Sequence, residues 1–277
     1  MRVQPLLSIV VPAYNEQDRL APTIQAYLGH CRDRQLAIEL IVVDDGSLDA
    51  TSALVESMSA EYPEIRLIRL AENRGKGYAV RTGVVNARGR LVLFADADGA
   101  TPISELGRLE AAIQAGADVA IGSRALLGGG VRVKARLYRR LMGRAFHLLV
   151  ETLTVRDIKD TQCGFKLFRG PVAHDLFSRM RMTGFSFDVE VLMMAQRRGY
   201  RIAEVPVNWV HQPGSKVNLA VDSMRMVRDL FIIRGRHLSG EYSSPHLAPL
   251  VKEGLSQAAD EPDSLNPKDM ALTPTRL

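Results

Sequence analysis

The stretch Leu7-Ser8-Ile9-Val10-Val11-Pro12-Ala13-Tyr14-Asn15-Glu16, residues 7–16, decides the fold, because an apolar β-branched run ends abruptly in polar residues. Continuous Ile and Val are typical of a strand buried on both faces, since crossover helices cover both sides of a parallel sheet. Helical patterns separate this run from further strand-like segments at 39–43, 65–70, 91–95, 118–121, 165–169 and 202–209. The sequence therefore predicts an α/β protein with an open, mostly parallel sheet and helices on both faces.

The composition fits one folded domain followed by a tail. The chain has 277 residues, of which 46% are hydrophobic and 24% charged, and this balance excludes a fibrous or fully disordered protein. Residues 239–277 carry 3 basic and 6 acidic side chains and lack apolar periodicity, so we predict a disordered acidic tail there. Residues 1–238, with a net charge of +8, form the predicted domain. This charge favours an anionic partner, which is nucleic acid, anionic lipid or a phosphorylated substrate.

Two features bear on the compartment. Cys31 and Cys163 lie far apart and form no metal-spaced or redox pair, which favours a reducing, cytoplasmic setting. The apolar runs are much shorter than the roughly 20 residues that span a bilayer. Residues 1–5 lead straight into the first strand without the apolar stretch of a signal peptide. We therefore expect no membrane span and no export signal.

Chemistry is expected at one edge of the sheet, because ligands of open α/β sheets bind at the carboxyl ends of the strands. Polar residues follow four of the strands, at 12–16, 44–47, 73–77 and 96–98. None of these segments contains the G-x-G-x-x-G loop of dinucleotide-binding folds or the G-x-x-x-x-G-K-[ST] phosphate loop. A nicotinamide or flavin enzyme and a P-loop nucleoside triphosphatase are therefore disfavoured.

Five charged residues at this edge are candidates for ligand binding. Asp96 and Asp98 can both bind one hard cation, whose remaining positions accept phosphate oxygens, and this arrangement would clamp a nucleoside diphosphate. Asp44 and Asp45 accept hydrogen bonds either from a base or ribose or from the start of the following helix. Ligand contact is favoured for Asp44, and the two interpretations are balanced for Asp45. Lys76 is flanked by two glycines. We expect it either to contact a base or phosphate or to be a solvated lysine of the loop.

Two later segments suggest contact with anions or lipid. Residues 132–144 carry six basic side chains and no acidic one, and the segment 132–147 predicts a helix facing a phosphate, a lipid headgroup or solvent. Nucleic acid is disfavoured, because the segment has few aromatic residues and no recognition motif. Residues 219–238 predict an amphipathic helix for which core packing is the first interpretation and the membrane interface the second. Its expected apolar side consists of Val221, Met224, Val227, Leu230 and Phe231.

Together these motifs resemble those of family 2 glycosyltransferases with a GT-A fold, a Rossmann-like open sheet, over residues 6–235. The general motifs are 10–16, 43–47, 73–77 and 96–98. Four later motifs are similar to those of dolichyl-phosphate β-glucosyltransferases, at 122–124, 160–168, 187–190 and 205–209. The resemblance implies an inverting hexosyltransferase that moves a sugar from a nucleotide-sugar donor, with UDP-glucose favoured, to a polyprenyl phosphate.

The resemblance also implies roles for individual residues. The donor-binding positions are Pro12, Tyr14, Glu16, Asp44, Lys76, Asp96, Ala97, Asp98 and Arg124. Asp96 and Asp98 are also the expected ligands of a divalent metal, Mg²⁺ or Mn²⁺, and they form the catalytic set with Asp188, a candidate for orienting the acceptor or a sugar hydroxyl. The resemblance implies phosphate contacts for Arg124 and a basic position over the site for Lys216, and we predict that these two residues hold the acceptor phosphate together with Arg132 and Arg139 of the basic segment. Because a phosphate monoester with a second pKa of about 6 is largely dianionic near neutral pH, it attacks without a strong base.

Several alternatives remain open from the sequence. Ala100 stands where mannosyl relatives often carry Gln, which disfavours a polyprenyl-phosphate mannosyltransferase that uses GDP-mannose. The amino-terminal membrane anchor usual in eukaryotic glucosyl enzymes is not seen, so we expect peripheral contact with the cytoplasmic face of a membrane through residues 132–147 and 219–238. Transfer to a non-lipid glycan is another alternative. A non-catalytic nucleotide-sugar or lipid-binding module ranks last, because Asp96 and Asp98 are both intact.

Overall fold

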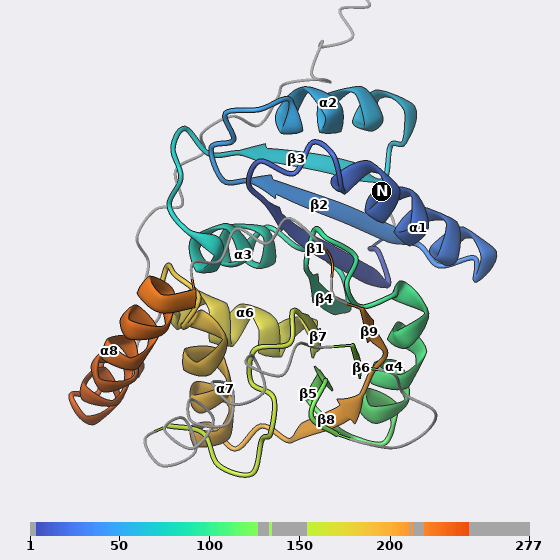
Figure 1. The fold of residues 1–277 in the computed structure, drawn as a ribbon. Coiled ribbons are helices and arrows are strands. Elements are labelled where there is room, and N and C mark those ends of the chain that lie inside the picture. Colours follow the sequence, from blue (N-terminus) through green and yellow to red (C-terminus); the bar gives the residue numbers. More distant parts are fainter. Residues whose placement is uncertain (1–3, 127–132, 135–153, 211, 213–218, 244–277) are drawn as a thin grey trace, which may run out of the picture.

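The computed structural model describes residues 4–126, 133–134, 154–210, 212 and 219–243. A sheet of seven strands lies at its centre in the order β3-β2-β1-β4-β7-β5-β8 (Figure 1). The strands are β1 (Leu7–Ala13), β2 (Ile38–Asp44), β3 (Ile65–Arg69), β4 (Leu91–Ala95), β5 (Val119–Ser123), β7 (Phe165–Arg169) and β8 (Ile202–Pro206). All neighbours pair in parallel except β7, which runs antiparallel to both β4 and β5. The predicted α/β class with a mostly parallel sheet is confirmed.

Helices cover both faces of the sheet (Figure 1). They are α1 (Leu20–Asp33), α2 (Thr51–Glu61), α3 (Lys76–Val85), α4 (Leu106–Gln114), α6 (Gly170–Arg179), α7 (Phe187–Arg197) and α8 (Leu219–Leu238), with a short 3-10 helix η1 (Ile103–Glu105) before α4. Alternate side chains of each strand enter opposite cores: Val10 packs with α3, α6, α7 and α8, whereas Ile9 and Val11 pack with α1, α2 and α4. Burial on both sides explains why β1 is a continuous apolar run.

The strand register brings the polar strand ends together. Ala13 of β1 lies opposite Asp44 of β2, and Val10 lies opposite Phe94 of β4. The residues that follow these three strands therefore emerge at the same edge of the sheet, as the sequence predicts.

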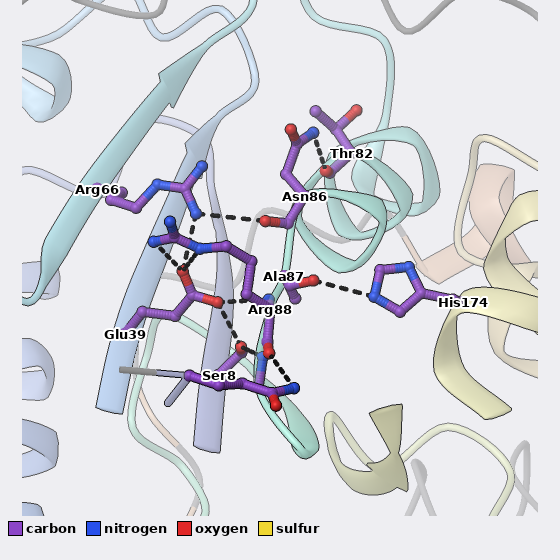
Figure 2. Close-up of polar contacts among 10 residues, drawn as sticks. Ser8, Glu39, Arg66, Thr82, Asn86, Ala87, Arg88 and His174 are labelled. Carbon is purple, nitrogen blue, oxygen red and sulfur yellow. Dashed lines mark hydrogen bonds and ion pairs between the residues drawn. The ribbon is translucent and has the colours of Figure 1, made fainter. Parts of the chain in front are cut away.

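The opposite edge is closed by a buried ionic cluster (Figure 2). Glu39, 3% exposed, accepts hydrogen bonds from Ser8 Oγ (2.6 Å), the backbone amide of Arg88 (2.5 Å) and Arg66 Nη1 (2.8 Å). Burial opposes the charge of Glu39, but these hydrogen bonds outweigh it and hold the pKa of the carboxyl below its ordinary value. The cluster thus ties β1, β2, β3 and the turn before β4 together at their amino ends.

The predicted helix at 132–147 is wrong at the two positions that the structure describes. Val133 and Lys134 form a short strand, β6, paired in parallel with β9 (Trp209–Val210). The other residues of this segment lie outside the described residues, as does Lys216. Within the described part of the chain, every helix is too short or too polar to cross a membrane.

Helix α8 forms where predicted, but its expected apolar side is wrong. Leu230 is fully buried in the core, whereas its neighbour Phe231 is 57% exposed and Met224 is 69% exposed. Consecutive residues point about 100° apart on a helix, so Leu230 and Phe231 cannot share one narrow face. The side chain of Val221 lies outside the described residues.

The folded domain also continues past Leu238, the predicted boundary. Tyr242 is 7% exposed, and its hydroxyl donates a hydrogen bond of 2.8 Å to Glu190 Oε1 on α7. The predicted tail therefore starts too early at residue 239, and residues 244–277 lie outside the described residues.

Candidate active site

The loops that follow β1 and β2 bind each other at the carboxyl edge. The backbone amide of Asn15 donates to Ser47 Oγ (2.9 Å), and the amide of Leu48 donates to Asn15 Oδ1 (2.8 Å). The amide of Glu16 donates to Thr51 Oγ1 (2.8 Å). Asn15 has a φ of +54°, a left-handed conformation that Asn adopts more readily than most residues. These bonds fix the position of the first loop against the second.

The three predicted donor-binding residues at the end of β1 and in the loop after it differ in their exposure. Pro12 and Tyr14 are partly exposed at the sheet edge and can face a ligand. Glu16 is 9% exposed, and its two carboxylate oxygens accept hydrogen bonds from Arg19 at 2.7 and 2.8 Å. Glu16 therefore holds the start of α1 through Arg19, and its proposed ligand contact would require this pair to open.

The aspartate favoured as a ligand contact after β2 is instead fully buried. Asp44 is 0% exposed, and its carboxylate accepts hydrogen bonds from the amide of Ser47 (2.9 Å) and the hydroxyl of Ser52. Both oxygens are thus used to shape the loop that leads into α2. This geometry gives Asp44 a structural role and leaves donor contact by its side chain without support.

Asp45 fixes the next loop along the edge. Its Oδ1 and Oδ2 accept hydrogen bonds from the amides of Arg74 (2.8 Å) and Gly75 (2.9 Å), and burial raises its pKa. Gly75 has a φ of +96°, and a Cβ there would lie 2.6 Å from the carbonyl oxygen of Thr183. A Cβ at Gly77 would likewise lie 2.7 Å from a backbone carbonyl oxygen of the same segment. The two glycines therefore permit close packing of α3 against residues 182–187, whereas the sequence had suggested ligand approach.

The centre of the site is an ion pair between α3 and the end of β4. Lys76 Nζ lies 2.7 Å from Asp96 Oδ1 and 5.5 Å from the centre of the Phe94 ring. Burial would lower the pKa of the Lys76 ammonium, but the charges of Asp96 and Asp188 outweigh it and raise the pKa. Lys76 therefore stays protonated and contributes positive charge beside the predicted metal ligands.

Gly164, which the sequence reasoning did not single out, makes room for the carboxylate of Asp96. A Cβ at Gly164 would lie 2.0 Å from Asp96 Oδ2, closer than any side chain permits. The carbonyl oxygen of Gly164 also accepts a hydrogen bond from the amide of Asp96 (3.0 Å). Its place within the motif 160–168 was the available signal, because a glycine is the residue that leaves room where another group approaches the backbone closely.

A buried ion pair lies next to this centre. Lys166 on β7 is 1% exposed, and its Nζ donates to Asp188 Oδ1 (2.5 Å) and to the carbonyl oxygen of Cys163 (2.6 Å). Burial raises the pKa of Asp188, and the charges of Lys166 and Lys76 oppose this shift. Asp188 lies in the first turn of α7, where the helix dipole also favours a carboxylate. The predicted catalytic residue Asp188 is thus 4% exposed and paired with a lysine that the sequence reasoning missed.

The residues at the end of β4 fit a divalent cation. Asp96 and Asp98 are both partly exposed, and Asp98 Oδ1 accepts a hydrogen bond from the amide of Ala100 (3.0 Å). Burial and the charge of Asp96 raise the pKa of Asp98, as expected for two carboxylates that share one region. In the described part of the chain no group of three or more His, Cys, Asp or Glu side chains could hold a metal. Mg²⁺ or Mn²⁺ at Asp96 and Asp98 would therefore take further oxygen ligands from a phosphate or water.

Arg124 is the one predicted acceptor-phosphate residue that the described residues include. Its Nε and Nη2 donate to the two carboxylate oxygens of Asp160 at 2.7 and 2.8 Å, and its guanidinium lies 5.6 Å from the centre of the Trp209 ring. Burial would raise the pKa of Asp160, but the charge and hydrogen bonds of Arg124 outweigh it and lower the pKa. The other three residues, Arg132, Arg139 and Lys216, lie outside the described residues. Ala97, between the predicted metal ligands Asp96 and Asp98, is 6% exposed.

Comparison with known proteins identifies the family. The family model described as Glycosyl transferase family 2 matches residues 8–177. This chain belongs to that family. The glycosyltransferase is 39% identical over 246 residues to a dolichyl-phosphate beta-glucosyltransferase of Dictyostelium discoideum, covering 84% of this chain and 75% of the relative. It is 40% identical over 249 residues to the enzyme of the same name from Drosophila melanogaster, covering 85% and 76%.

A solved structure confirms the GT-A fold of this glycosyltransferase. Glucosyl-3-phosphoglycerate synthase from Mycobacterium tuberculosis, in complex with Mn²⁺, UDP-glucose and phosphoglyceric acid, superposes with a TM-score of 0.62. The match covers 83% of this chain and 80% of the synthase at 20% sequence identity. At this identity the likeness concerns the fold.

Proposed function

We propose that this glycosyltransferase moves glucose from UDP-glucose to a polyprenyl phosphate, with inversion at the anomeric carbon, while bound peripherally to the cytoplasmic face of a membrane. The observation that carries the proposal is the carboxyl edge of the sheet, where Lys76 lies 2.7 Å from Asp96 and next to the strand-end loops. The names of relatives that are 39% and 40% identical to this chain over the aligned residues support the sugar and the acceptor. Cys31 and Cys163, both free and buried, agree with a reducing compartment.

The donor would lie across the ends of β1 and β4. Pro12 and Tyr14 are partly exposed there and would contact the nucleoside. Asp96 and Asp98 would hold Mg²⁺ or Mn²⁺, which supplies charge neutralisation for the departing diphosphate. Lys76 adds a second positive charge at the same place, and its contacts with Phe94 and Asp96 keep it oriented. A fixed charge of this kind needs no reorganisation as the diphosphate leaves.

The acceptor phosphate would be held mainly by positive charge. Arg124 is fixed by two hydrogen bonds to Asp160, so it can present the other side of its guanidinium without losing its position. Arg132, Arg139 and Lys216 remain proposed contacts for the same phosphate. Because the phosphate is already largely dianionic, the protein mainly has to position it and exclude water. Asp188, held by Lys166 at 2.5 Å, would orient a hydroxyl of the sugar or the acceptor.

The test is lipid-extractable label from the purified protein with polyprenyl phosphate and Mg²⁺, given labelled UDP-glucose or GDP-mannose in parallel. We expect label in the lipid phase from UDP-glucose alone. Asp98→Asn should reduce this label by roughly 100-fold. The neutral amide would bind the divalent cation more weakly, so the negative charge on the departing diphosphate would be less well neutralised. The matched control is Asp33→Asn, which changes an exposed aspartate at the end of α1 and should leave the label unchanged.

Each other outcome is informative. Label from GDP-mannose alone would overturn the proposed sugar. Donor hydrolysis without lipid label, in a preparation where Asp98→Asn abolishes hydrolysis, would overturn the proposed acceptor and favour a non-lipid glycan. Donor binding without turnover in any arm would favour a binding module.

A further inference from the structure

Helix α8 has a second apolar face, which points away from the protein. Met224, Phe231 and Leu238 are 69%, 57% and 75% exposed, and they are spaced seven residues apart. Seven residues turn an α-helix by about 700°, only 20° short of two full turns. The three side chains therefore form one line along the helix, which we call the outer stripe. In Figure 1, α8 lies at the periphery of the molecule beside α7.

The opposite side of α8 is anchored, so the helix cannot roll to bury the outer stripe. Leu230 and Ile233 are both 0% exposed in the core that α3, α6 and α7 share. Asp229 is 6% exposed, and its Oδ2 accepts a hydrogen bond of 2.9 Å from Ser186 Oγ. Breaking these contacts would expose core side chains and strand a buried carboxylate.

Arginines lie on both sides of the outer stripe. Arg228 and Arg234 are three residues before and after Phe231, which places them about 60° to either side of it on the helix. Both are exposed, and the side chain of Arg228 is 71% exposed although it also contacts Asp229. A line of large apolar side chains with a positive charge on each side is typical of helices that lie in the interface of an anionic bilayer.

The same pattern disfavours a second copy of the chain as the partner. Two paired helices need a second apolar line three or four residues along from the first, so that side chains of one fill gaps in the other. Val227, three residues after Met224, is the one apolar side chain of α8 at such a position, because the positions three and four residues after Phe231 are Arg234 and Gly235. A single stripe with charge at its borders fits a fluid lipid surface better than a helical seam.

We propose that the outer stripe and its two flanking arginines dock this glycosyltransferase on an anionic lipid surface. The proposal rests on the proposed function, because a lipid acceptor must be met at its membrane. The contacts of α8 connect docking to the site: Ser186 lies two residues before Asp188, and Gln162 Nε2 lies 3.8 Å from Met226 Sδ. Docking therefore holds the segments that carry Asp160 and Asp188 at a set place relative to the lipid headgroups.

The test is co-sedimentation of the full chain with phosphatidylcholine vesicles, with and without phosphatidylglycerol, in the absence of donor and acceptor. We expect the wild-type chain to bind most strongly to the anionic vesicles. The double variant Phe231→Ser/Leu238→Ser should bind these vesicles at least tenfold more weakly than the wild type. Leu48→Ser, which removes an 89% exposed leucine elsewhere, is the matched control and should bind as wild type does. The double variant Arg228→Gln/Arg234→Gln should lose the preference for anionic vesicles.

Four results would overturn the proposal: no binding of the wild-type chain, equal binding of the stripe variant, equal loss in Leu48→Ser, or no preference for anionic lipid. Sedimentation velocity adds another: a dimer that Phe231→Ser dissociates would make the stripe an interface between copies. Glucosyl transfer measured in detergent micelles separates this proposal from the proposed function. A stripe variant that transfers glucose in micelles but does not sediment with vesicles would support docking. A wild-type chain that binds vesicles but transfers no glucose would refute the proposed function alone.

Discussion

Replacing Gly164 with Ala should displace the carboxylate of Asp96. The added Cβ would lie 2.0 Å from Asp96 Oδ2, whereas ordinary van der Waals contact begins at 3.4 Å, so the carboxylate must move by about 1.4 Å. A misplacement of about 1 Å costs roughly 100-fold in rate when it affects a reacting or charge-stabilising group. We therefore expect the rate of sugar transfer, measured as kcat/KM, to fall by at least roughly 100-fold and the affinity for Mn²⁺ with UDP to fall in parallel.

Stability should change much less than activity, because the clash involves the end of a side chain that can rotate. Thermal unfolding of Gly164→Ala should therefore stay close to that of the wild type. Gly107→Ala on α4 is the matched control: its Cβ meets nothing within 4 Å, and Ala favours a helix by about 1 kcal/mol. The reasoning is refuted if Gly164→Ala binds Mn²⁺ and transfers sugar as the wild type does, or if its activity falls only because the protein unfolds.

Three further predictions concern buried polar contacts. Lys166→Met should destabilise the fold by about 3–5 kcal/mol in urea titrations, because it leaves the Asp188 carboxylate buried without its partner, and Lys166→Met/Asp188→Asn should recover part of that loss; equal single and double variants would contradict this. Glu39→Gln should cost about 1–3 kcal/mol at neutral pH. The pKa of Glu39 is lower in the folded than in the unfolded protein, so the charged carboxylate stabilises the fold above the unfolded pKa of about 4.3. This stabilisation disappears as the pH falls through the folded pKa, and the unfolding free energies of the wild type and of Glu39→Gln should therefore converge in acid. Tyr242→Phe should lower stability by about 1–2 kcal/mol by removing the bond to Glu190, and no change in unfolding would place the end of the domain before residue 242.

The sequence predicts those parts of the fold that depend on local patterns. Residues 7–11 lie in strand β1, which is apolar because both of its faces are buried, and the helix predicted at 219–238 is present as α8. The antiparallel direction of β7 could not be predicted, because it depends on which strands lie beside it. The depth of α8 in the core was also hidden, since both of its faces carry apolar residues.

In the candidate site, too, local patterns predict some features and tertiary packing sets the others. The cluster of polar strand ends follows from the rule for open sheets, and the structure brings Lys76 to Asp96. Asp44 and Asp45 are adjacent acidic residues with the same local signal, yet one binds the loop before α2 and the other the loop before α3. Lys166 and Asp188 are 22 residues apart and meet only through the packing of β7 against α7. Partners of this kind are set by tertiary structure, which local spacing does not encode.

Because β7 runs against its neighbours, it begins at the edge where they end. Its first residues therefore deliver Lys166, and Gly164 just before it, to the carboxyl ends of the parallel strands. One short segment consequently contacts both the end of β4 and the start of α7. In hybrid enzymes that join the first half of one relative to the second half of another, the junction should not separate residues 160–190 from the Asp96 loop that they contact. A hybrid that exchanges both segments together keeps the matched surfaces.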